Sequence, residues 1–197
     1  MAKLYRSGLV AGTMLLAMLT LSCATRPVTP AAGEQLRDES QVALKAMIER
    51  DPPIQSLLEH AAGYAVFPLV GKGGFVVGGA FGRGTVYEKG SFAGYARVRQ
   101  ASVGGVIGAR TSSLLLVFET AEDLQQFKTG QRIVFGAEAT AIALTEGSSA
   151  TTRFDNGVAV FALPRGGLMA DASLSGQEFR FEQSKDPIPD SSSVSVE

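Results

Sequence analysis

The hydrophobic pattern has a helical period before Gly63 and a strand period after it. Over residues 34–50, apolar positions three or four apart fall on one face, which predicts an amphipathic helix. The segment Asp51-Pro52-Pro53 is expected to end this helix and begin a second one, with Asp51 as a candidate cap and the prolines in the first turn. Gly63 is expected to end the second helix.

Short apolar and aromatic runs follow Gly63, separated by glycine-rich breaks that are typical of turns between β-strands. The predicted strands are 64–69, 74–81, 85–89, 92–98, 103–109, 113–118, 133–135, 138–144, 157–163, 168–174 and 178–181. A short helix over 120–127 interrupts them, and Thr120 and Asp123 have the spacing of a capping pair. The fold class is therefore predicted as α+β: two N-terminal helices packed on a curved, mainly antiparallel sheet or partly closed barrel, with one short internal helix.

Glycine inside the predicted strands indicates sharp curvature, β-bulges or close backbone packing, because glycine weakens a flat strand. Spacings of the GxxxG type also occur, but nearby basic residues interrupt the apolar runs, which argues against membrane helices. Residues 63–75 and 157–168 are similar to each other and suggest two related hairpins, although convergence on common hairpin chemistry would produce the same likeness.

The N-terminus has the pattern of an export signal. Lys3 and Arg6 precede an apolar run over 8–21, which is shorter than the roughly 20 apolar residues of a membrane span. The chain has one cysteine, Cys23, and Thr20-Leu21-Ser22-Cys23 resembles the lipobox of bacterial lipoproteins in Ser22 but departs from it in Thr20 and Leu21. An ordinary signal peptide or an inner-membrane anchor would be the alternative.

A lone cysteine cannot form an internal disulfide, so we predict cleavage before Cys23 and fatty acylation of its sulfur. Ala24 stands where lipoproteins kept at the inner membrane have Asp, which favours the periplasmic face of the outer membrane. The predicted organisation is a signal peptide over 1–22, a lipidated tether over 23–33, one domain over 34–182 and a disordered tail over 183–197.

Charge is distributed unevenly. Residues 64–118 contain six basic residues and one acidic residue, whereas residues 119–197 contain six basic and twelve acidic residues. A basic half beside an acidic half is expected to orient a protein on an anionic surface. Alternation over 91–99 predicts one face with Phe92, Gly94, Ala96 and Val98, and another with Tyr95, Arg97 and Arg99.

Guanidinium groups donate bidentate hydrogen bonds to phosphate, so these basic positions are candidate contacts for a lipid headgroup, although a solvated outer face would have the same pattern. The candidate residues are Lys72, Arg83, Lys89, Tyr95, Arg97, Arg99 and Arg110. Acyl chains, if admitted, would be expected near Phe75 and Phe81.

The order of several motifs resembles the SYLF (Ysc84-type) lipid-binding domain over roughly residues 34–182. The motifs that carry this resemblance are Ala62-Gly-Tyr-Ala-Val-Phe-Pro68, Gly71-Lys-Gly-Gly-Phe-Val-Val-Gly-Gly79, Gly82-Arg-Gly-Thr-Val-Tyr87, Ser102-Val-Gly-Gly-Val-Ile-Gly-Ala109 and Val158-Ala-Val-Phe161 before Arg165-Gly-Gly-Leu168. Gly90-Ser-Phe-Ala-Gly94 replaces the family's Trp-Ser-x-Pro segment, and Val160-Phe161 replaces its Tyr-Ser pair. The resemblance implies phospholipid binding and no reaction.

The residues themselves give little support for catalysis. The single histidine, His60, is expected to cap or flank a helix end. A nucleophile elbow, a complete P-loop and a Cys/His metal cluster are all missing from the sequence. We therefore predict a non-enzymatic envelope lipoprotein that needs no cofactor or metal, binds phospholipid or an anionic membrane surface, and does not bind nucleic acid. The alternative is an envelope structural or interaction lipoprotein that binds a protein partner.

Overall fold

A computed structural model describes residues 30–130, 133–135, 142–143, 145–151 and 154–183. Its elements, in chain order, are α2 (Pro30–Arg50), α3 (Pro53–His60), β1 (Gly63–Glu88), β2 (Ser91–Phe118), α4 (Ala121–Lys128), β3 (Ile133–Phe135), β4 (Ile142–Ala143), η2 (Ser149–Thr151) and β5 (Val158–Glu182). The predicted signal peptide, Cys23 and nearly all of the predicted C-terminal tail lie outside the described residues.

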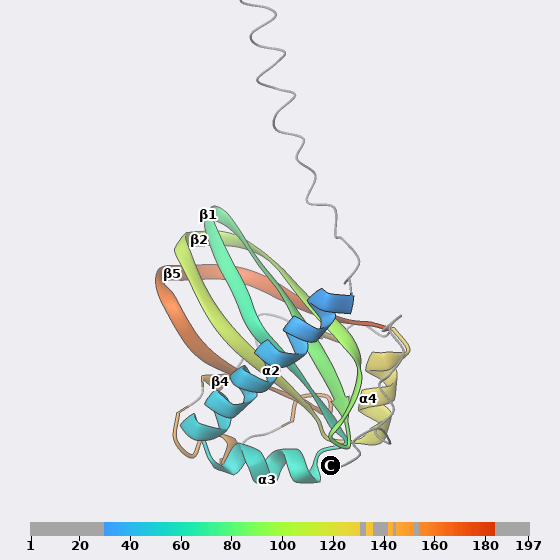
Figure 1. The fold of residues 1–197 in the computed structure, drawn as a ribbon. Helices are drawn as coiled ribbons and strands as arrows, with labels where there is room; N and C mark the ends of the chain where they lie inside the picture. The colour runs from blue at the N-terminus through green and yellow to red at the C-terminus, as the bar shows by residue number, and fades with distance from the viewer. Residues whose placement is uncertain (1–29, 131–132, 136–141, 144, 152–153, 184–197) are drawn as a thin grey trace, which may run out of the picture.

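The strands form one curved, open sheet with the order β1-β2-β5-β3, and β4 pairs with β5 (Figure 1). The pairs β1–β2, β2–β5 and β3–β5 are antiparallel, and β4–β5 is parallel. Helices α2 and α3 pack on the sheet as expected, so the predicted α+β class is confirmed.

The prediction of many short strands is wrong, because β1, β2 and β5 are long and continuous. The glycine-rich breaks are bends inside these strands rather than turns between separate ones. At the sharpest bend, Phe75 pairs with Ile107 and Val77 pairs with Val103, so one residue of β1 lies opposite three residues of β2. A bulge of this kind curves the strand that carries the extra residues around its neighbour.

The bend folds β1 back on itself into a first leg, residues 63–74, and a second leg, residues 78–88. A Cβ atom on Gly84 would lie 2.8 Å from the Phe67 ring, and one on Gly82 would lie 2.6 Å from the Val70 side chain. Both contacts are shorter than atoms tolerate. Glycine is therefore required where the second leg crosses the first.

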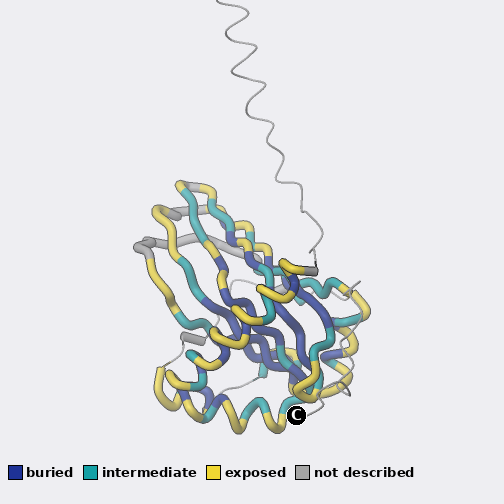
Figure 2. Tube along the Cα trace, in the orientation of Figure 1, coloured by how far each residue is buried: buried dark blue, intermediate teal, exposed yellow. Residues whose placement is uncertain are grey.

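Two hydrophobic clusters lie on opposite faces of the folded sheet, and the buried residues gather in the part of the sheet away from the bend (Figure 2). The inner cluster fills the space between the legs and includes Phe67, Leu116 and Phe179. The outer cluster lies beneath α2 and α3 and includes Met47 and Ile54 from these helices. The alternation of side chains along each strand supplies both clusters at once.

The helix boundaries differ modestly from the predictions. Helix α2 begins at Pro30, inside the segment predicted as a tether, because proline suits a first helical turn. Helix α3 ends at His60, so Gly63 begins β1 rather than ending the helix. The capping pair of α4 is confirmed: the Thr120 hydroxyl accepts a bond from the Asp123 amide, and the Asp123 carboxylate accepts one from the Thr120 amide.

Asp51 does not cap α3 with its side chain. Its buried carboxylate instead accepts hydrogen bonds from the Gly147 amide at 2.9 Å, the Ser148 hydroxyl at 3.0 Å and the Ser149 amide at 2.8 Å. Burial raises the pKa of Asp51, but these hydrogen bonds outweigh it and hold the pKa below its ordinary value. Asp51 thus ties the α2–α3 junction to a segment almost a hundred residues later.

The two similar segments lie on either side of β2 rather than in two hairpins. Ala65 pairs with Leu116, whereas the equivalent Ala159 pairs with Val117. This one-residue offset turns equivalent side chains to opposite faces, so that Phe67 enters the inner cluster and Phe161 the outer one.

The Gly84→Ala variant should lose about 2–3 kcal/mol of unfolding free energy, because its methyl group would overlap Val66 and Phe67. Gly71→Ala is the matched control, since no atom lies within 4 Å of a Cβ at that position. Urea unfolding of both variants measures the difference. Equal stability would mean that the legs are farther apart than described.

The Asp51→Ala variant should lose about 2 kcal/mol at neutral pH, because the buried Ser149 amide and the partly buried Gly147 amide lose their acceptor. Since folding depresses the pKa of Asp51, its stabilising contribution is present above the ordinary value of 3.8 and is lost as the pH falls through the lower folded value. Urea unfolding at pH 7 and at about pH 3 should show the wild type and the variant converging in acid.

Candidate functional site

Three arginines lie side by side on β1, β2 and β5, at the level of the second leg of β1. Arg97 of β2 pairs with Arg83 of β1 on one side and with Arg180 of β5 on the other. Residues paired in this way share one face, and neighbouring strands lie about 4.8 Å apart. We call Arg83, Arg97 and Arg180 the arginine row.

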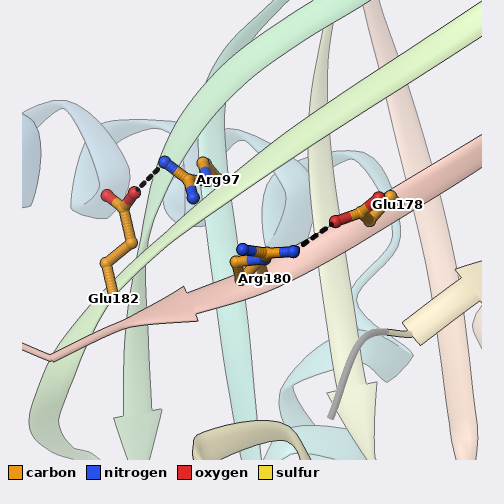
Figure 3. A network of polar contacts seen from close by, with 4 residues as sticks. All are labelled: Arg97, Glu178, Arg180 and Glu182. Carbon is orange, nitrogen blue, oxygen red and sulfur yellow. Dashed lines mark hydrogen bonds and ion pairs between the residues drawn. The ribbon is translucent and has the colours of Figure 1, made fainter. Parts of the chain in front are cut away.

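Two carboxylates of β5 stabilise the arginine row (Figure 3). Arg97 Nη1 lies 2.6 Å from Glu182 Oε1, and Arg180 Nη2 lies 3.2 Å from Glu178 Oε1. The side chains of Arg97 and Glu182 are only 23% and 30% exposed, so water screens this pair less than a surface pair. The carboxylates therefore offset much of the repulsion among the guanidinium groups.

Arg99 is the exposed cation next to the arginine row. It pairs in register with Phe81 of β1 and Glu178 of β5, two residues closer to the bend than Arg97. Arg83, Arg97, Arg99 and Arg180 together outnumber Glu178 and Glu182 by two charges. An anion such as a phosphate group would approach this surface most easily at Arg99.

Tyr95 belongs to the core rather than to the cationic surface. It is only 4% exposed, and its hydroxyl accepts a hydrogen bond of 3.0 Å from Arg37 Nη1 of α2. The Arg37 guanidinium also lies over the Phe92 ring, 5.1 Å from the centroid. The predicted contact of Tyr95 with a headgroup therefore has no support in the geometry.

The prediction that Phe92 shares a face with Ala96 and Val98 is wrong, because a β-bulge lies between them. Val86 pairs with Gly94 but Tyr87 pairs with Phe92, so a bulge at residue 93 reverses the alternation. The Phe92 ring consequently contacts Tyr87 and Tyr95 at centroid distances of 6.1 and 5.1 Å. Ala96 and Val98 lie in the inner cluster, as the alternation predicts.

The remaining candidates lie at two other places. Lys72 and Arg110 pair in register on the first leg, three residues from Phe75 and Ile107 respectively. Lys89 lies in the β1–β2 turn with a φ of 48°, at the opposite end of the strands from the bend. The seven predicted headgroup residues therefore do not form one site.

An apolar strip lies on the outside of the bend. Phe75, Val77, Val103 and Ile107 are 76%, 64%, 67% and 59% exposed, and they form two register pairs. Gly78 pairs with Ser102, which is fully buried, so the adjacent Val77 and Val103 point outward. Phe81, which is 50% exposed, lies between this apolar strip and the arginine row.

The acidic half of the sequence is not separate from the basic half in space. Strand β5 brings Glu178, Arg180 and Glu182 directly beside β2, which the division by sequence position did not foresee. The alternating Glu-x-Arg-x-Glu pattern carried that signal, because it puts all three side chains on one face of a strand.

The part of the chain that the structure describes gives little support for a catalytic histidine, a metal site or a membrane-spanning helix. His60, the last residue of α3, is exposed, and its Nδ1 atom lies 2.7 Å from the Ser56 carbonyl oxygen. Among the described residues, His, Cys, Asp and Glu form no group of three suited to a metal ion. Helices with the length and apolar character of a membrane span are likewise absent from the described residues.

Comparison with protein families gives a match to Ysc84, described as "Las17-binding protein actin regulator", over residues 99–186. This range runs from Arg99 through β5 and includes the Arg180 end of the arginine row. The resemblance noted for residues 34–98 lies outside it and stays a prediction. Comparison with curated proteins gives no match.

The Tyr95→Phe variant should lose about 1 kcal/mol of unfolding free energy, because the hydrogen bond from Arg37 disappears. Binding of anionic vesicles should not change, since the Tyr95 side chain is buried. Urea unfolding and vesicle co-sedimentation measure the two effects. Weaker vesicle binding by a variant of unchanged stability would show that Tyr95 contacts the lipid headgroup.

Proposed function

The chain belongs over residues 99–186 to the Ysc84 (SYLF) family, which is generally lipid-binding and actin-related, and on this premise we propose that the protein binds phospholipid at an anionic membrane surface. The supporting observation is the cationic surface of the second leg, where Arg99 is exposed beside the arginine row. Arginine and lysine near an anionic bilayer contribute about 1 kcal/mol each.

The protein is proposed to act without catalysis. The family consists of binding domains, and both carboxylates of the site are engaged in ion pairs with arginines. Such pairing suits reversible contact with phosphate oxygens, because a phosphate can replace a carboxylate as the guanidinium partner.

The proposed location is the cell envelope. A basic start, an apolar run over 8–21 and the lone Cys23 support export, cleavage before Cys23 and acylation of its sulfur. Cys23 lies seven residues before the start of α2, a span of at most about 25 Å in an extended chain. This short connection would hold the domain beside the bilayer, and Ala24 favours the periplasmic face of the outer membrane.

A protein partner is the second candidate function, because the matched family is described as Las17-binding. The same cationic surface would then bind acidic side chains instead of phosphate. Failure of the purified domain to bind vesicles of any composition would favour this alternative.

Co-sedimentation of a chain beginning at Ala24 with vesicles tests the main proposal. Every described helix, strand and hydrophobic cluster lies within residues 30–183, so this chain keeps all of the described contacts. Binding should require anionic lipid and should weaken as salt rises.

Replacing Arg99 by Ala should reduce binding about fivefold, since one cation of this surface is lost near the membrane. Arg50→Ala is the matched control, because Arg50 is exposed at the end of α2, away from the cationic surface. Equal losses in the variant and the control would show that net charge alone, and not this surface, governs binding.

A further inference from the structure

We propose that the apolar strip (Phe75, Val77, Val103 and Ile107) inserts into the hydrocarbon region of an anionic bilayer, so that the domain enters the membrane bend first. This inference rests on the proposed lipid-binding function and adds the depth and orientation of binding. The arginine row and Arg99 alone would hold the protein only at the headgroups.

The apolar strip is the part of the described sheet where large apolar side chains gather on the surface. Seven large hydrophobic residues are exposed in the described part of the chain, and four of them form the strip. The bend projects from the end of the sheet opposite α3 and α4, and α2 crosses the sheet without covering it (Figures 1 and 2). Contiguous exposed apolar side chains of this kind mark a surface that binds something.

The positions of nearby cations point to a bilayer as the occupant. Lys72 and Arg110 lie three residues behind Phe75 and Ile107, and Arg99 lies four residues behind Val103. At about 3.3 Å per residue, these cations lie roughly 10–13 Å behind the strip. Interfacial apolar elements penetrate about 5–10 Å, so insertion of the strip brings the cations to the level of the lipid phosphates.

The shape and charge of the bend disfavour other occupants. The strip lies on the convex side of the bulge, whereas a groove for a peptide or a helix is concave. A second copy bound through the same strip would offer an apolar surface but no phosphate groups to the cations behind it.

A single introduced tryptophan tests the proposal, because the chain has no tryptophan of its own. The Phe75→Trp variant of the chain beginning at Ala24 is mixed with vesicles of phosphatidylcholine and phosphatidylglycerol in equal parts. Insertion should shift the tryptophan emission to shorter wavelength, and lipids brominated on their acyl chains should quench it. Val42→Trp on α2, an exposed position away from the bend, should show neither effect.

Serine substitutions provide the matching loss of function. Phe75→Ser combined with Ile107→Ser should reduce vesicle binding about tenfold or more, since two exposed apolar anchors are removed. Val42→Ser should bind as the wild type does. Circular dichroism and urea unfolding should be unchanged in both, because all three side chains are exposed.

Failure of this inference is distinguishable from failure of the proposed function. Vesicle binding without a spectral shift in the Phe75→Trp variant, and without loss in the serine variant, would keep the proposed function and overturn insertion. Absence of wild-type binding to these vesicles would overturn both. A dimer in sedimentation velocity that the serine variant abolishes, without any change in vesicle binding, would assign the strip to a second copy instead.

Discussion

The close approach of the two legs of β1 is the constraint on which the rest of the structure depends. At Gly82 and Gly84 the second leg passes so near Val66, Phe67 and Val70 that a methyl group would not fit. This approach encloses the inner cluster and leaves the opposite face free for α2 and α3. It also places the arginine row at the level of the second leg and the apolar strip on the outside of the bend.

The surface of the second leg balances repulsion and attraction. Three arginines in adjacent strands would separate if nothing offset their charge, and Glu178 and Glu182 provide that offset from the same strand as Arg180. The two carboxylates are fewer than the guanidinium groups around them, and Arg99 stays exposed at the edge of the row. The result is a cationic surface on which ion pairs reduce the repulsion between the arginines.

Local signals in the sequence predicted the helices and the fold class well. The capping pair at Thr120 and Asp123 and the prolines after Asp51 act over a few residues, so their spacing was informative. The continuity of β1 was not predictable in the same way, because a glycine that permits a turn also permits a bend. Only the ladder with β2, which joins Gly63 to Phe118, distinguishes the two.

The candidate site was predictable only as far as signals within a single strand reach. Arg97 and Arg99 were found from alternation within one strand, but Arg180 and its glutamates required the pairing of β2 with β5. Tyr95 was predicted at the surface because its contact with Arg37 of α2, nearly sixty residues earlier, cannot be inferred from one strand. Contacts between distant segments decided which basic residues remain on the surface.

The central position of β2 has a consequence for how the protein acquires its fold. Strands β1 and β2 are joined by the short Lys89-Gly90 turn and can pair as soon as both exist, whereas β5 arrives only after about forty further residues. Until then one edge of β2 offers its unpaired amides and carbonyls along 28 residues. A chain stalled at that stage would be a template for intermolecular pairing, and the docking of β5 removes this exposed edge.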